Sequence, residues 1–286
     1  MTRRKIVLAS LCALVGLAAL FAGYLAVETR ARAVLEARHA RPASEVQAAT
    51  APEAVAAGRR LAVAAGCTFC HGDGLAGPGP GPASSLRSPN LTLVVGHRSD
   101  ADLDLAIRHA LRADGTGELA MPSYAYAGFS DREVAEIAGY LRSLPPRGAA
   151  VQPRLPGFMT RLAIAAGRFK SQTDRLADAR PPLDAGQQFE AGRHLANVAC
   201  GQCHGSDLGG APGLPGPDLT VRTYYSRAQF HQLMKTGEMP QNVHSELMQE
   251  VARANFSSFT EAEVDAIYDY LQARDVRLAA VRKPAS

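Results

Sequence analysis

The pentapeptide Cys-x-x-Cys-His occurs twice in this chain, at residues 67–71 and at residues 200–204. This spacing is the attachment signature of c-type haem, because two thiols bond to the vinyl groups of one haem and the adjacent histidine can reach its iron. A structural zinc site would need four ligands, and a redox-active cysteine pair would not need the histidine. We therefore expect two covalently attached c-type haems, each held by one motif: Cys67, Cys70 and His71, and Cys200, Cys203 and His204.

The N-terminal region contains a long charge-free segment. Residues 6–27 follow a basic stretch at residues 2–5, and as a helix they would span roughly 33 Å, enough for a bilayer core of about 30 Å. A cleaved signal peptide is the alternative, but the apolar run is long for one and no clean Ala-x-Ala site closes it. We expect an uncleaved single-pass anchor within residues 1–30. Because haem is attached outside the bacterial inner membrane, the body that follows should lie in the periplasm.

The charge balance excludes one class of partner. Residues 1–41 contain seven basic and two acidic side chains, so they contribute +5 to a formal net charge of +4 and leave the remainder at −1. A nearly neutral body argues against a nucleic-acid surface. The basic residues instead bracket the apolar segment, as expected near a membrane.

The two motifs lie within two similar segments of sequence. Ala-Gly-Arg-x-Leu precedes each motif, Pro-(Asn/Asp)-Leu-Thr follows each, and a Ser/Thr-x-x-Glu capping box then begins a helical apolar pattern. Two copies of one small helical domain explain this repeat better than one larger fold does. The matching segments are 57–61 and 191–195, 89–92 and 217–220, and 130–133 and 260–263.

The expected fold class is all-α, with an N-terminal transmembrane helix followed by two tandem domains at residues 52–146 and 185–276. Each copy should contain a helix that enters the motif, a middle helix, a ligand loop and a capped terminal helix. The linker, residues 147–184, is punctuated by proline and contains a helical pattern at residues 158–170. We favour a helix packed between the domains over an interfacial membrane helix for this segment.

The sixth ligand of each iron is expected to be a methionine. In the first copy, Met121 is the sole methionine between the haem motif and the capping box. In the second copy, Met239 has the better local match, since Pro240 follows it, but Met248 has the better distance to the capped helix. We favour Met248, with Met239 next and His244 as a bis-histidine alternative of lower potential.

These residues resemble class I cytochrome c, and more closely the membrane-anchored dihaem c-type cytochromes akin to the cytochrome c subunits of bacterial alcohol and gluconate dehydrogenases. The resemblance covers nearly all of the chain after residue 50. In that family the proline of a Pro-Asn-Leu stretch offers its carbonyl to the proximal histidine. The resemblance therefore implies that Pro89 orients His71 and that Pro217 orients His204.

The resemblance implies electron transfer between a dehydrogenase or quinol-oxidising complex and a terminal oxidase or soluble cytochrome. One alternative is a dihaem enzyme of the peroxidase or thiosulfate dehydrogenase type. A catalytic haem usually needs an open or displaceable sixth position, and the methionines in both copies argue against that. A second alternative is a haem-based sensor, but no signalling domain follows Leu271. Since the two ligand loops differ, we expect unequal potentials and a relay between the two haems.

Overall fold

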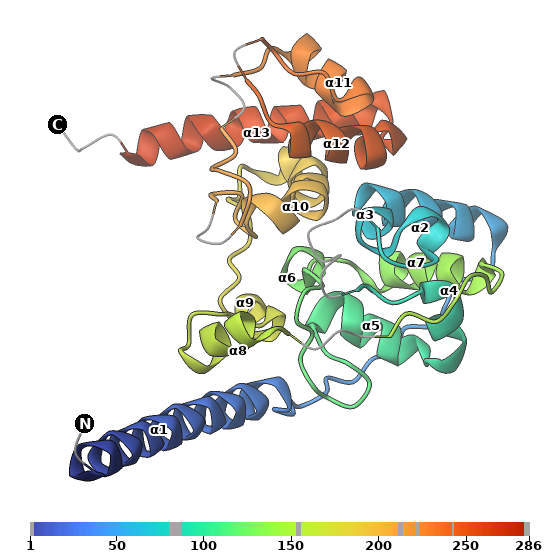
Figure 1. The fold of residues 1–286 in the computed structure, drawn as a ribbon. Coiled ribbons are helices and arrows are strands. Elements are labelled where there is room, and N and C mark those ends of the chain that lie inside the picture. The colour runs from blue at the N-terminus through green and yellow to red at the C-terminus, as the bar shows by residue number, and fades with distance from the viewer. Residues whose placement is uncertain are drawn as a thin grey trace.

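The computed structural model describes residues 3–79, 87–152, 156–210, 214–220, 224–241 and 243–282. Within these ranges the regular secondary structure is helical and no β-strand forms; two isolated bridges join Arg38 with Thr116 and Leu111 with Gly117. Figure 1 shows a long N-terminal helix, two helical bodies and a pair of short helices between them in sequence. The predicted all-α class is confirmed.

Helix α1, Arg3–Leu35, contains the charge-free segment and continues beyond it. Among the described residues it is the helix that is long and apolar enough to cross a membrane, and its most apolar window is 0% buried in the protein. A signal sequence near the N-terminus can also form a helix that meets these criteria of length and apolarity, so the anchor stays a prediction. The chain that follows α1 runs along the first body, where the backbone N–H of His39 donates to Gly115 and that of Ala49 donates to Ala135.

The first body is built around α2 and α7, which pack against each other. The middle helix, expected at about Asp100 to Leu111, stops at His109, because the next residue, Ala110, adopts a left-handed conformation with φ 56°. The elements of this body are α2 (Pro52–Ala64), α3 (Cys67–His71), η1 (Asp73–Leu75), α4 (Leu91–Val94), η3 (Val95–His97), α5 (Asp100–His109), α6 (Ser123–Tyr126) and α7 (Asp131–Ser143).

The second body repeats this plan with α10 packed against α13. Its attachment motif is the last turn of one continuous helix, whereas in the first body Gly66, at φ 72°, breaks the helix before the motif. The elements are η4 (Gln187–Phe189), α10 (Glu190–His204), α11 (Arg227–Thr236), α12 (Glu246–Asn255), η5 (Phe256–Ser258) and α13 (Glu261–Arg282).

The repeat seen in the sequence corresponds to repeated packing and capping. Gly58 of α2 lies against the backbone of Glu136 in α7, and Gly192 of α10 lies against the backbone of Ala266 in α13. Both capping boxes form as predicted: Ser130 caps α7 through Glu133, and the same reciprocal hydrogen bonds join Thr260 and Glu263 at the start of α13. Each Ala-Gly-Arg segment is therefore the point at which the entering helix crosses the terminal helix.

The linker differs from the expectation. Its helix α8, Phe158–Ala165, ends earlier than predicted, since Gly167 takes up φ 68°. The expected position between the two domains is wrong for this helix, because its main partner is α1 (Figure 1). A second short helix, α9 (Gln172–Ala177), packs against α6 of the first body instead.

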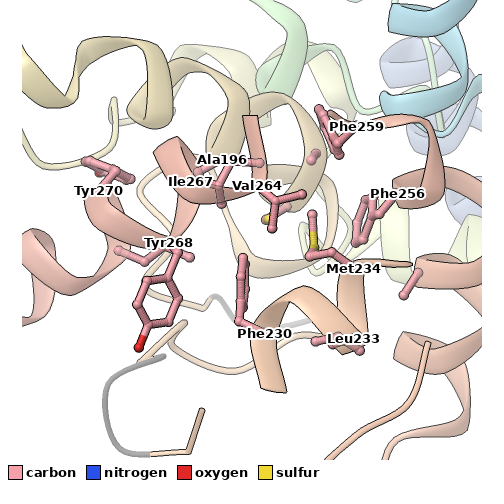
Figure 2. Packing of buried hydrophobic residues seen from close by; sticks show 14 of the residues in the cluster. Ala196, Phe230, Leu233, Met234, Phe256, Phe259, Val264, Ile267, Tyr268 and Tyr270 are labelled. Carbon is pink, nitrogen blue, oxygen red and sulfur yellow. The ribbon is translucent and has the colours of Figure 1, made fainter. Parts of the chain in front are cut away.

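The two hydrophobic cores meet. The second core contains Phe230, Met234 and Phe256 packed toward Val264 and Ile267 of α13 (Figure 2). That cluster also includes Ala64 of the first body, and the core of the first body includes Val198 of the second. The bodies therefore share buried apolar surface along the helices that carry the attachment motifs.

Candidate haem sites and the junction between them

The first attachment motif occupies the single helical turn of α3. Nδ1 of His71 lies 3.0 Å from the carbonyl oxygen of Pro89. A carbonyl oxygen can only accept, so Nδ1 carries the hydrogen and Nε2 keeps its lone pair. The loop that holds Pro89 is itself fixed, because Nδ2 of Asn90 donates to the carbonyl oxygens of Arg147 and Ala149.

The second motif has the same local geometry. Nδ1 of His204 lies 2.8 Å from the carbonyl oxygen of Pro217, in the position that the repeat assigns to Pro89. The neighbouring Gly216 leaves no room for a side chain, since a Cβ there would lie 2.7 Å from Nδ1 of His204. The structure thus places both proximal-histidine candidates against the carbonyls of the two prolines.

Sequence reasoning missed the residue that fixes the second proline loop. Arg274 of α13 is 2% exposed, and its guanidinium donates to a carboxylate oxygen of Asp218 and to the carbonyl oxygens of Leu208 and Leu219. Asp218 follows Pro217 directly, so Arg274 fixes the loop that holds Pro217. The amide of Asn90 fixes the loop that holds Pro89 in the same way. Arg274 lies in a charged stretch of α13 that looks exposed in the sequence, so its buried, loop-fixing role could not be predicted.

The donor set fits covalently bound haem c. Burial lowers the pKa of both His71 and His204, although their proline hydrogen bonds oppose the shift, so both rings are neutral at neutral pH. Burial raises the pKa of the Cys67 thiol to about 12 and that of Cys70 to about 11. Redox-active cysteine pairs show the opposite shift. Among the described residues, no group of three or more His, Cys, Asp or Glu side chains is arranged to hold a metal ion.

All three methionine candidates for the sixth ligand pack against a hydrophobic core. No contact among the described residues decides between Met239 and Met248 for the second iron. Met121 packs against the core of the first body, and both Met239 and Met248 pack against the core of the second. Met248 lies in the first turn of α12, the counterpart of α6 in the repeat, whereas Met239 lines a surface depression beside Gln229. The choice of Met248 stays a prediction. His244 is exposed.

The two motifs meet at a junction of buried and partly buried hydrogen bonds. Gln202, between the cysteines of the second motif, donates from Nε2 to the carbonyl oxygen of Ala65 over 2.7 Å. Ala65 lies two residues before Cys67, and its carbonyl also accepts the Tyr126 hydroxyl at 2.6 Å. The carbonyl oxygen of Gln202 in turn accepts the Tyr124 hydroxyl at 2.6 Å. These contacts could not be predicted from the sequence.

The junction is reciprocal. Helix α6 of the first body packs on α10, which ends in the second motif, and α12 of the second body packs on α3, which carries the first motif. Arg60 of the first body pairs with Glu263 at 2.7 Å, and His194 of the second body pairs with Glu133 at 2.7 Å. Arg60 and His194 occupy the same repeat position, as do the two glutamates. Each body thus binds the capping-box carboxylate of the other.

Comparison with known proteins agrees with this geometry. The family model for cytochrome c matches residues 55–145 and 189–275, together more than half of the chain. The chain therefore belongs to the cytochrome c family, as a dihaem class I c-type cytochrome akin to the cytochrome subunits of dehydrogenases.

Among curated proteins, the chain is similar to the fructose dehydrogenase cytochrome subunit of Gluconobacter japonicus, at 24% identity over 272 residues. The alignment covers 82% of this chain and 55% of that protein, so the chain spans about half the length of this relative. Both comparisons support an electron-transfer cytochrome with covalently bound haem c.

Proposed function

We propose that this chain carries electrons between two haem domains across their reciprocal junction, at the periplasmic face of an inner membrane. The donor would be a dehydrogenase or a quinol-oxidising complex, and the acceptor a terminal oxidase or a soluble cytochrome. The observation that carries this proposal is the direct hydrogen bond from Gln202, inside one attachment motif, to Ala65, at the entrance of the other.

The residues of the chain would hold one haem at each motif. Cys67 and Cys70, and their counterparts Cys200 and Cys203, would form the thioether bonds, while His71 and His204 would offer Nε2 to the irons. Bound haem c supplies an iron that cycles between the ferric and ferrous states, one electron at a time. Met121 and Met248 would close the sixth positions, which favours electron transfer over substrate binding. At the second iron, Met239 is the next candidate after Met248, followed by His244.

The junction would keep the two motifs at a fixed separation. The side chain of Gln202 donates to the carbonyl oxygen of Ala65, and the Tyr124 hydroxyl donates to the carbonyl oxygen of Gln202, so both bonds join the second motif to the first body. The Tyr126 hydroxyl also donates to the carbonyl oxygen of Ala65, so the backbone is held on both sides of this contact. A fixed, short separation makes transfer within one molecule faster than transfer between molecules, because the effective concentration of the second site is high.

The membrane location and the partner are also proposals. Helix α1 supports a single-pass anchor, by its length and by the exposure of its apolar side chains. The similarity to a cytochrome subunit of fructose dehydrogenase supports a dehydrogenase as electron donor, without identifying its substrate. Fractionation of native cells should place the protein in membranes, and a mature N-terminus after residue 20 would contradict the anchor.

Flash photoreduction of the oxidised full chain tests the relay. We expect a first-order phase, independent of protein concentration, in which the two haem spectra exchange an electron. The double variant Tyr124→Phe with Gln202→Leu should slow this phase several-fold. Tyr268→Phe is the matched control, because it removes a hydroxyl bonded to Tyr225 within the second body. A wild-type exchange rate that rises with protein concentration would contradict the proposal.

A further inference from the structure

Helix α8 has an apolar surface that the rest of the described chain leaves partly exposed. Outside α1, six large apolar side chains of the described residues are exposed, and three of them lie on this one helix. Phe158 is 43% exposed, Met159 is 72% exposed and Leu162 is 37% exposed. Exposed apolar side chains gathered in this way mark a surface that binds another apolar phase.

The position of α8 beside α1 indicates which phase that is. The rings of Phe158 and Tyr24 stack with centroids 6.0 Å apart, and the Arg161 guanidinium pairs with Glu28 at 2.9 Å. Further along, Ile164 and Ala165 face Arg30 and Ala33 around a shared depression. Sequence numbers rise together along both helices, so α8 runs parallel to α1 and its N-terminal end reaches toward the apolar segment.

The register sets the depth of this end. Tyr24 lies three residues before the end of the charge-free run, which is about 4.5 Å at the rise of an α-helix. Phe158 is level with Tyr24, at the depth where aromatic side chains collect in membrane proteins. The pair of Glu28 with Arg161 lies one turn further out, and the exposed side chains of Arg30 and Arg32 follow at the level of lipid headgroups.

We propose that the N-terminal turn of α8, with Phe158, Met159 and Leu162, inserts into the interface of the lipid bilayer beside α1. This inference rests on the proposed membrane anchor. The occupant is lipid, because Phe158 stacks on Tyr24 and so joins the exposed apolar side chains of α8 to those of α1, the segment proposed to cross the bilayer. The spanning helix and the inserted turn then form two contacts with the bilayer.

The second contact has a consequence for the haem body. The chain after α1 is bonded to the first body through His39 and Ala49, and α9, which follows α8, is bonded through Gln172 to the carbonyl oxygens of Glu118 and Leu119. Both membrane contacts are therefore tied to the same body, close to the loop of Met121. Two fixed contacts prevent free rotation about α1, so the first body faces membrane partners in one orientation.

Thiol accessibility in nanodiscs tests the insertion. In the full haem-loaded chain with Cys12→Ser, single cysteines are introduced by Met159→Cys, Leu14→Cys and Tyr224→Cys, and a membrane-impermeant maleimide is added. Tyr224 is the exposed control on the second body, 52% exposed, and Leu14 reports on the anchor, 65% exposed. Discs containing one copy of the protein exclude a second chain as the cover, and phosphatidylcholine is the only lipid supplied.

We expect Met159→Cys to react at least ten-fold more slowly than Tyr224→Cys, although Met159 is the more exposed residue within the protein. Equal rates at these two positions, with Leu14→Cys protected, would overturn the insertion of α8 and leave the anchor intact. Rapid reaction of Leu14→Cys would instead overturn the anchor, and with it the inference that rests on it. The Soret band of each variant shows that the haem body is folded.

Discussion

Replacing Gly58 by alanine tests the packing of the entering helix against the terminal helix. A Cβ at this position would lie 2.8 Å from the backbone nitrogen of Ile137, and closer still to the carbonyl oxygen of Glu136. These are backbone atoms of α7, so they cannot turn away as a side chain would. Helices α2 and α7 must therefore separate in the Gly58→Ala variant.

Two effects of opposite sign decide the magnitude. Alanine is better than glycine in a helix by about 1 kcal/mol, which would stabilise α2. Overpacking of a close contact costs about 1–3 kcal/mol, and a clash with backbone should lie at the upper end of that range. The net loss in the free energy of unfolding is therefore about 2 kcal/mol. If the two bodies melt as one unit, because they share core residues, the loss corresponds to about 4–8 °C in Tm.

Thermal unfolding followed by far-ultraviolet and Soret circular dichroism measures this loss. Gly96→Ala is the matched control, because a Cβ at Gly96 meets nothing within 4 Å. The control should stay within about 0.5 kcal/mol of wild type. A Gly58→Ala variant as stable as Gly96→Ala, or more stable, would refute the close contact between α2 and α7.

Further predictions concern the axial ligands and pH. Met121→Ala and Met248→Ala should each open one iron to exogenous ligands such as imidazole, seen as a shift of the Soret band; if Met239→Ala alone perturbs the second haem, the choice of Met248 is wrong. Burial raises the pKa of Glu133, but hydrogen bonds from His194 and Ser130 outweigh it and lower the pKa to about 2. A lowered carboxyl pKa stabilises the fold above the unfolded value near 4.5, and that contribution is lost as pH falls toward 2. Because the carboxylate is partly exposed, this contribution to the free energy of unfolding is about 1–2 kcal/mol. Denaturant unfolding should therefore show that the difference in free energy of unfolding between wild type and Glu133→Gln falls by that amount from pH 6 to pH 2.

Much of each haem domain could be predicted because the relevant signals are local in sequence. The motif spacing, the capping boxes at Ser130 and Thr260, and the repeated Ala-Gly-Arg segments each depend on residues a few positions apart. Helical periodicity and cap chemistry act within a turn or two, so they can be read without tertiary information. The role of the two proline loops was predicted from the family resemblance, and the structure places the carbonyl oxygens of Pro89 and Pro217 against His71 and His204.

The junction between the bodies could not be predicted in this way. Gln202 and Ala65 are separated by 137 residues, and neither residue type indicates a cross-domain contact. Arg60 and His194 hold equivalent repeat positions, but their partners became evident only when the bodies were placed together. The linker helix was misplaced for a related reason: its apolar side chains show that it must pack, but not that α1 is the partner.

The most direct test of the central claim is a potentiometric titration of the purified full chain, combined with its mass under denaturing conditions. We predict a mass excess of two haems, which denaturation does not remove, and two resolved one-electron steps of unequal potential. The reduced protein should pass both electrons to a soluble oxidant without sustained turnover of peroxide or thiosulfate. A single covalent haem, or turnover of either substrate at enzymatic rates, would contradict the account.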